Sequence, residues 1–340
     1  MKNIYDLKYE ELESFLLDIN EKKYRTKQLY EWLYKHKIFH YQEMTNLNAE
    51  LVQKLSTNLN NDFIKIKELQ KGTKANKYLF ELLDGNLIEA VLMKHDYGNS
   101  LCVSSQVGCN MGCTFCESGR LKKVRDLETY EMVQQILLIE KEINARIDSV
   151  VIMGIGEPFD NYDNVMRFIR IINSPHGLAL GARHITISTC GLIPGIEKFG
   201  EEEIQVNLAI SLHAATDELR SKIMPINRVY TLDMLIEALK KYTQRTNRRI
   251  TIEYVILDKI NDSREDAERL ANLLKGINVY VNLIPYNETS HLEFKKATAE
   301  SLQVFYEVLK KAGVDITIRK EYGSDIDGAC GQLRAGRITK

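Results

Sequence analysis

The chain has 340 residues, of which 44% are hydrophobic and 27% are charged, and its formal net charge is −1. This composition excludes a disordered chain, and six cysteines in this length are too sparse for a disulfide-rich secreted domain. No apolar signal core opens the chain and no run approaches the roughly 18 apolar residues of a membrane span, so we expect a cytoplasmic protein with no membrane partner.

Residues 1–60 are expected to form a small helical domain. Apolar residues recur there at the spacing of helical turns, as at Leu12 and Leu16. Asn46 and Asn48 can cap a further helix. Residues 61–95 are expected to form a β-hairpin connector.

The hairpin signal is an Asp-Gly turn at Asp84 and Gly85, between the strand-like runs 78–82 and 87–91. Because the turn residues favour a reversal and the runs alternate, we expect two antiparallel strands here.

From residue 96 to residue 340 the chain alternates strand-like and helical segments. The expected strands are 101–104, 149–153, 185–188, 206–212, 250–256 and 279–284. They are rich in Val and Ile, which is typical of a parallel sheet buried on both faces. We predict an α/β fold, a partial six-unit (β/α) barrel, with a doubly wound open sheet as the alternative.

Three cysteines follow the first expected strand, and Cys109, Cys113 and Cys116 have the spacing C-x3-C-x2-C. Three thiolates on one loop can ligate three irons of a [4Fe–4S] cluster, which leaves the fourth iron an open position. That iron can chelate the amino and carboxylate groups of S-adenosylmethionine (SAM), and a reduced cluster can pass one electron to its sulfonium. A zinc site completed by a distant His is the alternative. The iron–sulfur interpretation is favoured, since zinc knuckles usually have a second cysteine pair.

Polar and glycine residues recur where the expected strands end, which is where (β/α) barrels place their chemistry. They are Gly156 and Glu157 after the second strand, Ser188 at the end of the third, Ser211 and His213 at the end of the fourth, and Asn287 after the sixth. Glu157 can accept from the SAM ammonium group. The two serines and the asparagine can hold the carboxylate, ribose or adenine.

Three further cysteines lie outside the loop. Cys102 lies in the first strand and is expected to be a buried small apolar residue, and Cys190 is expected to be structural. Cys330 lies between Gly328 and Gly331, so we expect a mobile, accessible thiol.

Basic residues gather in three places. They are Lys22, Lys23, Arg25, Lys27, Lys35 and Lys37; then Lys65, Lys67, Lys71, Lys74 and Lys77; and then Arg120, Lys122, Lys123 and Arg125 directly after the cysteine loop. Such clusters can neutralise RNA phosphates, or they are ordinary solvated surface.

The cysteine loop, with Phe115 before its last cysteine, resembles the radical SAM signature. The wider similarity is to the RlmN and Cfr family of RNA methyltransferases, and to its RlmN branch in particular. The segments that carry it are 101–109, 153–158, 210–213, 224–227, 281–287 and 325–333, together with the helical start of the chain.

This resemblance implies a role for each matched residue. Cys109, Cys113 and Cys116 would hold the cluster, and Gly156, Glu157, Ser188, Ser211, Leu212, His213 and Asn287 would bind SAM. Cys330 would carry a methyl group, Cys102 would resolve the covalent intermediate, and Glu89 would be the general base.

The resemblance also implies the reaction, which is methylation of C2 of adenosine 2503 in 23S ribosomal RNA, and of adenosine 37 in transfer RNAs for some members, through an S-methylcysteine. From the same resemblance we expect the N-terminal domain to be of an RNA-binding type and the protein to be a monomer. We also expect an electron donor such as flavodoxin or ferredoxin. Two alternatives stay open: Cfr-like methylation of C8, and a non-catalytic RNA-binding protein with a metal site. Glu117-Ser118 and Cys190 depart from the usual family pattern and leave room for altered substrate choice.

Overall fold

One ten-stranded sheet organises the chain, which the computed structural model describes in residues 1–289, 291–319, 323, 326 and 328–333. The strand order is β14-β13-β12-β11-β10-β9-β6-β5-β4-β3, so the sheet is parallel at one end and antiparallel at the other. The strands are β3 (Lys65–Lys71), β4 (Ala75–Glu81), β5 (Leu87–His95), β6 (Gly98–Val103), β9 (Ser149–Ile152), β10 (Ile185–Thr189), β11 (Asn207–Ser211), β12 (Ile250–Ile256), β13 (Val279–Pro285) and β14 (Asp315–Ile318).

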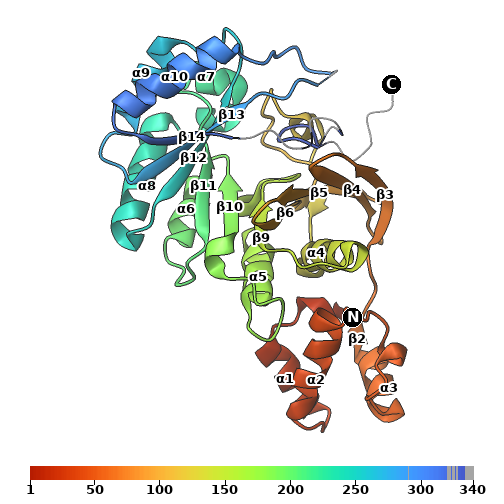
Figure 1. Cartoon of the computed structure of the whole chain (residues 1–340). Coiled ribbons are helices and arrows are strands. Elements are labelled where there is room, and N and C mark those ends of the chain that lie inside the picture. Colours follow the sequence, from red (N-terminus) through yellow and green to blue (C-terminus); the bar gives the residue numbers. More distant parts are fainter. Residues whose placement is uncertain (290, 320–322, 324–325, 327, 334–340) are drawn as a thin grey trace.

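The parallel part runs from β6 to β14 and confirms the predicted α/β architecture with its six strands. A seventh parallel strand, β14, pairs with β13 and was not predicted from the sequence. The helices that connect these strands are α4 (Thr129–Ile143), α5 (Tyr162–Asn173), α6 (Ile193–Phe199), α7 (Asp217–Ile223), α8 (Leu232–Thr246), α9 (Arg264–Leu273) and α10 (Ala299–Lys311). Figure 1 shows them along the outer side of the curved sheet. All carboxyl ends of the parallel strands therefore meet at one edge.

The antiparallel part is made by β3, β4 and β5. The predicted hairpin is confirmed, because β4 and β5 are antiparallel neighbours on either side of the Asp84-Gly85 turn. The hairpin is part of the main sheet, since β5 also pairs with β6. In that pairing Val91 lies opposite Cys102, which brings β5 next to the first barrel strand.

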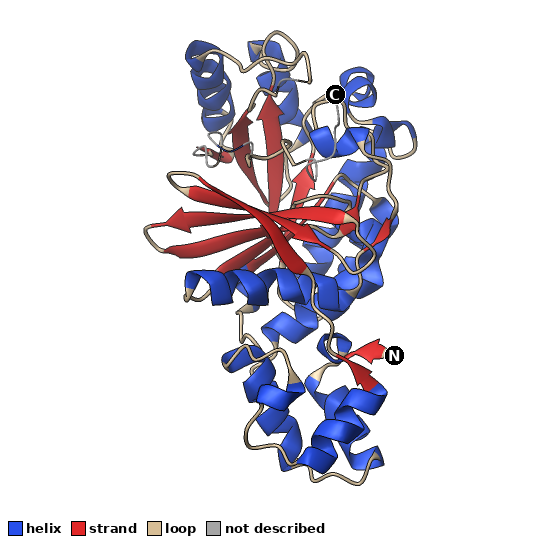
Figure 2. Ribbon diagram, turned by 90° about the vertical axis from the view of Figure 1, so that its right-hand side faces the viewer, coloured by secondary structure: helices blue, strands red, loops and turns tan. Residues whose placement is uncertain are grey.

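The N-terminal segment forms a separate helical layer beneath the barrel (Figures 1 and 2). Its elements are β1 (Lys2–Asn3), α1 (Tyr9–Asp18), α2 (Tyr24–Tyr30), which continues as a π-helix over Glu31–Lys35, α3 (Ala49–Asn58) and β2 (Leu59–Asn60). The predicted cap of α3 is present, because the side chain of Asn48 accepts from the N–H of Leu51 at 2.9 Å. Strands β1 and β2 pair in parallel.

Several polar contacts attach this domain to the barrel helices, and two of them involve Asp6 and Glu11. The Asp6 carboxylate accepts from the N–H of Tyr130, at the start of α4, at 2.8 Å. Arg167 on α5 forms an ion pair with Glu11 at 2.6 Å. No helix of the described chain is long and apolar enough to cross a membrane.

Candidate active site

The cysteine loop follows β6 and is held at both ends by backbone hydrogen bonds. The N–H of Cys109 donates to the carbonyl of Leu121 at 2.9 Å, and the N–H of Thr114 donates to Ile223 at the end of α7 at 2.9 Å. Gly108 has a φ of +77°, and a Cβ there would collide with the backbone of Lys122. The fold therefore fixes the loop before any metal is considered.

The three thiols of the loop line one cavity together. Burial raises the pKa of Cys109 to about 12 and that of Cys113 well above its usual range, and the charge of Cys116 raises both further. Three buried thiolates are stable side by side only if they share a cationic partner.

The spacing of the three cysteines on one loop fits a [4Fe–4S] cluster, in which three thiolates bind three irons and the fourth iron keeps an open position.

The cavity above the cysteine loop has a volume of about 140 Å³ and is open to solvent. Besides the cysteines it is lined by Gly156, Glu157, Ser188, Ser211, His213 and Asn287. The structure therefore brings together six of the seven residues assigned to SAM, from the ends of β9, β10, β11 and β13. The exception is Leu212, whose side chain is fully buried in the main hydrophobic core.

Glu157 is buried and ties two strand ends together. Its carboxylate accepts from the N–H of Phe159 at 3.0 Å and from the N–H of Cys190 at 2.7 Å. Burial nevertheless raises its pKa, because these hydrogen bonds do not fully replace the water that the carboxylate loses. Gly156 before it has a φ of +111°, and a Cβ there would lie 2.6 Å from Cβ of Gln106. This glycine therefore lets the loop pass close to its neighbour.

His213 is neutral in the folded protein. Its Nδ1 accepts from the N–H of Val255 at 3.0 Å, so the ring carries its proton on Nε2. Burial, followed by the charge of Arg220, lowers the pKa of His213 to about 3. The ring of Phe115 packs edge-on against it at 4.9 Å. His213 can thus donate one hydrogen bond into the cavity, and it stays uncharged at physiological pH.

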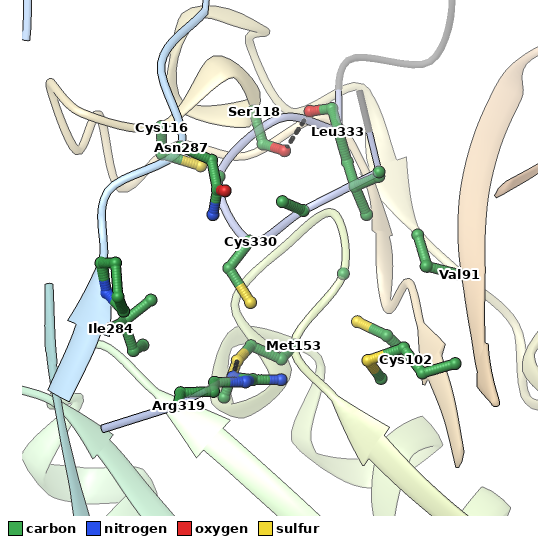
Figure 3. A pocket seen from close by; sticks show the side chains of 16 residues that line it. Val91, Cys102, Cys116, Ser118, Met153, Ile284, Asn287, Arg319, Cys330 and Leu333 are labelled. Atoms are coloured by element: carbon green, nitrogen blue, oxygen red, sulfur yellow. Dashed lines mark hydrogen bonds between the residues drawn. The ribbon is translucent and has the colours of Figure 1, made fainter. Parts of the chain in front are cut away.

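A second cavity adjoins the first and is lined by two cysteines outside the cysteine loop that the resemblance singled out (Figure 3). Cys102, from β6, and Cys330 both line it, and Cys330 also lines the first cavity, above the cysteine loop. Burial, followed by the charge of Cys330, raises the pKa of Cys102 to about 12. Two cysteines 228 positions apart in the chain thus share one hollow beside the cysteine loop.

Glu89 lies on β5 two residues before Val91, which lines the second cavity, but Glu89 is not itself among the lining residues. It is buried and forms an ion pair with Lys77 of β4 at 3.5 Å. Its backbone carbonyl accepts from the hydroxyl of Ser104 at 2.6 Å.

The basic cluster after the cysteine loop is largely paired within the protein. Arg125 contacts Glu131 and Asp84 at 2.7 Å each, and Lys123 contacts Asp126 and Asp160 at 2.8 Å each. These cations therefore fix the rim of the site as well as adding positive charge to it.

Several residues of the site were missed in the sequence. They are Arg220, which is fully buried behind the strand ends; Glu253 and Met153, which line the cavities; and Arg319, which follows β14 beside Cys330 and Cys102. Glu253 carried a weak signal, since it is the one acid inside the apolar run Ile250–Ile256. Arg319 carried none, because its strand was not recognised.

Comparison with known proteins agrees with this geometry. Residues 103–274 match the radical SAM superfamily, and residues 2–60 match the ribosomal RNA large subunit methyltransferase N-terminal domain. A probable dual-specificity RNA methyltransferase RlmN of Acholeplasma laidlawii is 51% identical over 98% of this chain and 99% of its own. One from Thermoanaerobacter is 48% identical over 98% of both chains. The crystal structure of a radical SAM methyltransferase from Sphaerobacter thermophilus superposes with a TM-score of 0.94 at 40% identity, over 98% of this chain and 100% of that one.

Proposed function

Because the chain belongs to the RlmN family of radical SAM RNA methyltransferases, we propose that it methylates C2 of adenosine 2503 in 23S ribosomal RNA, through S-methylated Cys330. Adenosine 37 of some transfer RNAs is the second proposed target. The cofactors of the protein are a [4Fe–4S] cluster and SAM. The observation that carries the proposal is that Cys330 lines both cavities, one shared with the cluster cysteines and one shared with Cys102.

The chemistry of adenine explains why a methyl-bearing thiol is needed. C2 is an electron-poor ring carbon and a poor nucleophile, so it does not attack the methyl group of SAM directly. When bound, the cluster and SAM would supply a one-electron cleavage and a hydrogen-atom abstraction. The task of the protein is to hold a methyl group between these cofactors and the base, and Cys330 is suited to that task by its position.

Cys330 would receive its methyl group from SAM by displacement and lose its thiol proton. Once the methyl carbon is bonded to C2, the thiolate of Cys102 would attack the sulfur of Cys330. The sulfur–carbon bond breaks, a disulfide forms, and a reductant that supplies two electrons and two protons restores both thiols. This exchange requires the two sulfurs to meet, which their shared cavity favours.

Loss of the proton from C2 needs a base, and we propose Glu89. Two observations support this role for Glu89. The residue is buried, and Val91, two residues further along the same strand, lines the second cavity with Cys102 and Cys330. Its ion pair with Lys77 would orient the carboxylate, and a base must be positioned within reach of the proton that it removes.

The substrate must present its adenosine unstacked, because the thiol cavity lies inside the fold. We propose that the helical domain of residues 1–60 binds RNA, with exposed Lys22, Lys27 and Lys35 as phosphate contacts. A flavodoxin or ferredoxin as electron donor, a monomer, and a cytoplasmic location complete the proposal.

Mass spectrometry of 23S ribosomal RNA tests the function. Cells that lack their own enzyme and express this chain should contain 2-methyladenosine, and Cys330→Ala should abolish it. A mass gain at C8 instead would support the Cfr-like alternative. The purified anaerobic chain should hold about four irons, and zinc without iron would support the non-catalytic alternative.

A further inference from the structure

Arg319 shares the second cavity with both reactive thiols (Figure 3). It follows directly after β14, and its backbone N–H donates to the carbonyl of Leu283 on β13 at 2.8 Å. Its side chain is only 23% exposed. The last strand of the sheet thus delivers a buried guanidinium to the cavity that holds Cys330 and Cys102.

The surroundings of Arg319 leave its charge largely available to the thiols. Nη1 lies 4.0 Å from Oε2 of Glu253, and the same carboxylate oxygen accepts from Asn282 at 2.9 Å. Nη1 also lies 3.8 Å from Sδ of Met153, which is a weak acceptor. One carboxylate at the limit of ion-pair distance does not neutralise a buried cation fully.

Among the described residues, the groups with the largest electrostatic effects on Arg319 are Cys330, Glu253 of β12, Cys102 of β6 and Tyr97 between β5 and β6. His95 of β5 in turn has its pKa lowered in part by Arg319. The interaction with Cys330 is the first of those that raise the pKa of Arg319, which agrees with the cavity that the two side chains share.

We propose that Arg319 is a positioning residue that stabilises the thiolate forms of Cys330 and Cys102. The roles given to these thiols rest on the proposed function. A thiolate, and not a thiol, accepts a methyl group or attacks a sulfur. Burial opposes that form at Cys102, since it raises the pKa of Cys102 to about 12, and Arg319 acts in the opposite direction. Arg319 thus favours one thiolate at a time, whichever cysteine is to react.

The pH profile of thiol alkylation tests this inference without RNA or methyl transfer. The background is the full chain with Cys109, Cys113 and Cys116 replaced by serine, so that Cys102, Cys190 and Cys330 are the remaining thiols. Iodoacetamide modification is followed at each of them by peptide mass spectrometry between pH 6 and pH 10. In Arg319→Gln we expect alkylation of Cys330 and Cys102 to be roughly tenfold slower at neutral pH, because the cation that shares their cavity is lost.

Two control variants show whether an effect of Arg319→Gln comes from the lost charge at Arg319 or from a disturbed fold. Arg319→Lys keeps the charge and should react within about threefold of the parent, and its circular dichroism should match that of the parent. Arg249→Gln removes an exposed arginine paired with Asp315 and should change nothing. Cys190 should not respond to any of them, because the cation near it is Arg220.

Overlapping profiles for Arg319→Gln and its parent at Cys330 and Cys102 would overturn the inference. So would an equal loss in the Lys and Gln variants. Failure of the proposed function has a different signature, since it appears as unmethylated RNA with the wild-type chain.

Discussion

The hydroxyl of Ser118 donates a hydrogen bond at 2.7 Å to the carbonyl of Leu333, which lies 215 residues further along the chain. Next to it, the N–H of Glu117 donates to the carbonyl of Gly331 at 2.7 Å. Ser118 follows the cysteine loop and Leu333 follows Cys330, so these bonds fasten the segment that contains Cys330 to the cysteine loop.

Ser118→Ala should loosen the segment around Cys330 without removing the cluster ligands. A buried carbonyl left without its donor costs about 1–2 kcal/mol. We therefore expect roughly tenfold faster amide hydrogen exchange in residues 328–333, measured by mass spectrometry, with unchanged iron content. Ser301→Ala, which removes a hydroxyl at the exposed start of α10, is the control. Equal exchange in the two variants would show that the bond is dispensable.

Gly156→Ala should abolish SAM binding. The new Cβ would lie 2.6 Å from Gln106, so the loop that carries Glu157 would have to move. Gly276→Ala is a matched control, because Gly276 also has a positive φ, +81°, but has no atom within 4 Å of a new Cβ. Backbone strain of about 1 kcal/mol is common to both variants. Equilibrium dialysis with labelled SAM distinguishes them, and normal binding by Gly156→Ala contradicts the assigned cavity.

Arg220→Met should destabilise the fold by about 3–5 kcal/mol. Arg220 donates to the carbonyls of Cys190 at 2.7 Å, Leu212 at 3.1 Å and Ser211 at 3.3 Å, and to the side chain of Asn227 at 2.9 Å. Removing the guanidinium would leave these buried acceptors unpaired. Urea unfolding measures the free-energy change.

Lys222→Ala is the control for Arg220, since it removes a cation two residues away in an exposed pair with Glu218. Its effect should stay within about 0.5 kcal/mol. An effect of Arg220→Met that small would mean that water replaces the arginine.

Asp6→Asn should stabilise the protein at neutral pH and not in acid. Burial raises the pKa of Asp6 from 3.8 to about 6, so its charged form is disfavoured in the folded state. The unfolded chain therefore ionises first, and the wild type loses stability relative to the variant as the pH rises from about 4 to about 6. We expect a gain of about 1–2 kcal/mol at pH 7.5 and none at pH 3.5. The asparagine oxygen can still accept from Tyr130.

Urea unfolding at both pH values measures the effect of Asp6→Asn. Asp18→Asn, at an exposed position, should give the same small difference at each pH. A gain for Asp6→Asn that is equal at pH 3.5 and 7.5 would exclude the electrostatic explanation.

The main elements of the fold could be predicted because each has a local signal. The strands from β6 to β13 are mostly apolar and most are rich in Val and Ile, and an Asp-Gly turn marks the β4–β5 hairpin. Strand β14 was missed because it is four residues long, only half-buried, and has one alternating apolar pair. The pairing of β5 with β6, which joins the hairpin to the barrel sheet, could not be predicted from any local sequence pattern.

The site divides in the same way. The cysteine loop and the polar strand ends were visible, because ligand spacing and position after a strand are local properties. Arg319 could not be found, since its importance comes only from its meeting with Cys330 across the fold. Glu89 came from family resemblance, and its buried pairing with Lys77 depends on the register of β4 and β5.

The parallel pairing of β1 with β2 has a consequence for synthesis on the ribosome. Lys2 and Asn3 are made before their strand partners Leu59 and Asn60, which complete the pair only after the intervening helices have been made. That domain can then close as a unit before any strand of the barrel has emerged. The nascent barrel would grow from a folded helical domain, and the segment that contains Cys330 would join after the barrel strands.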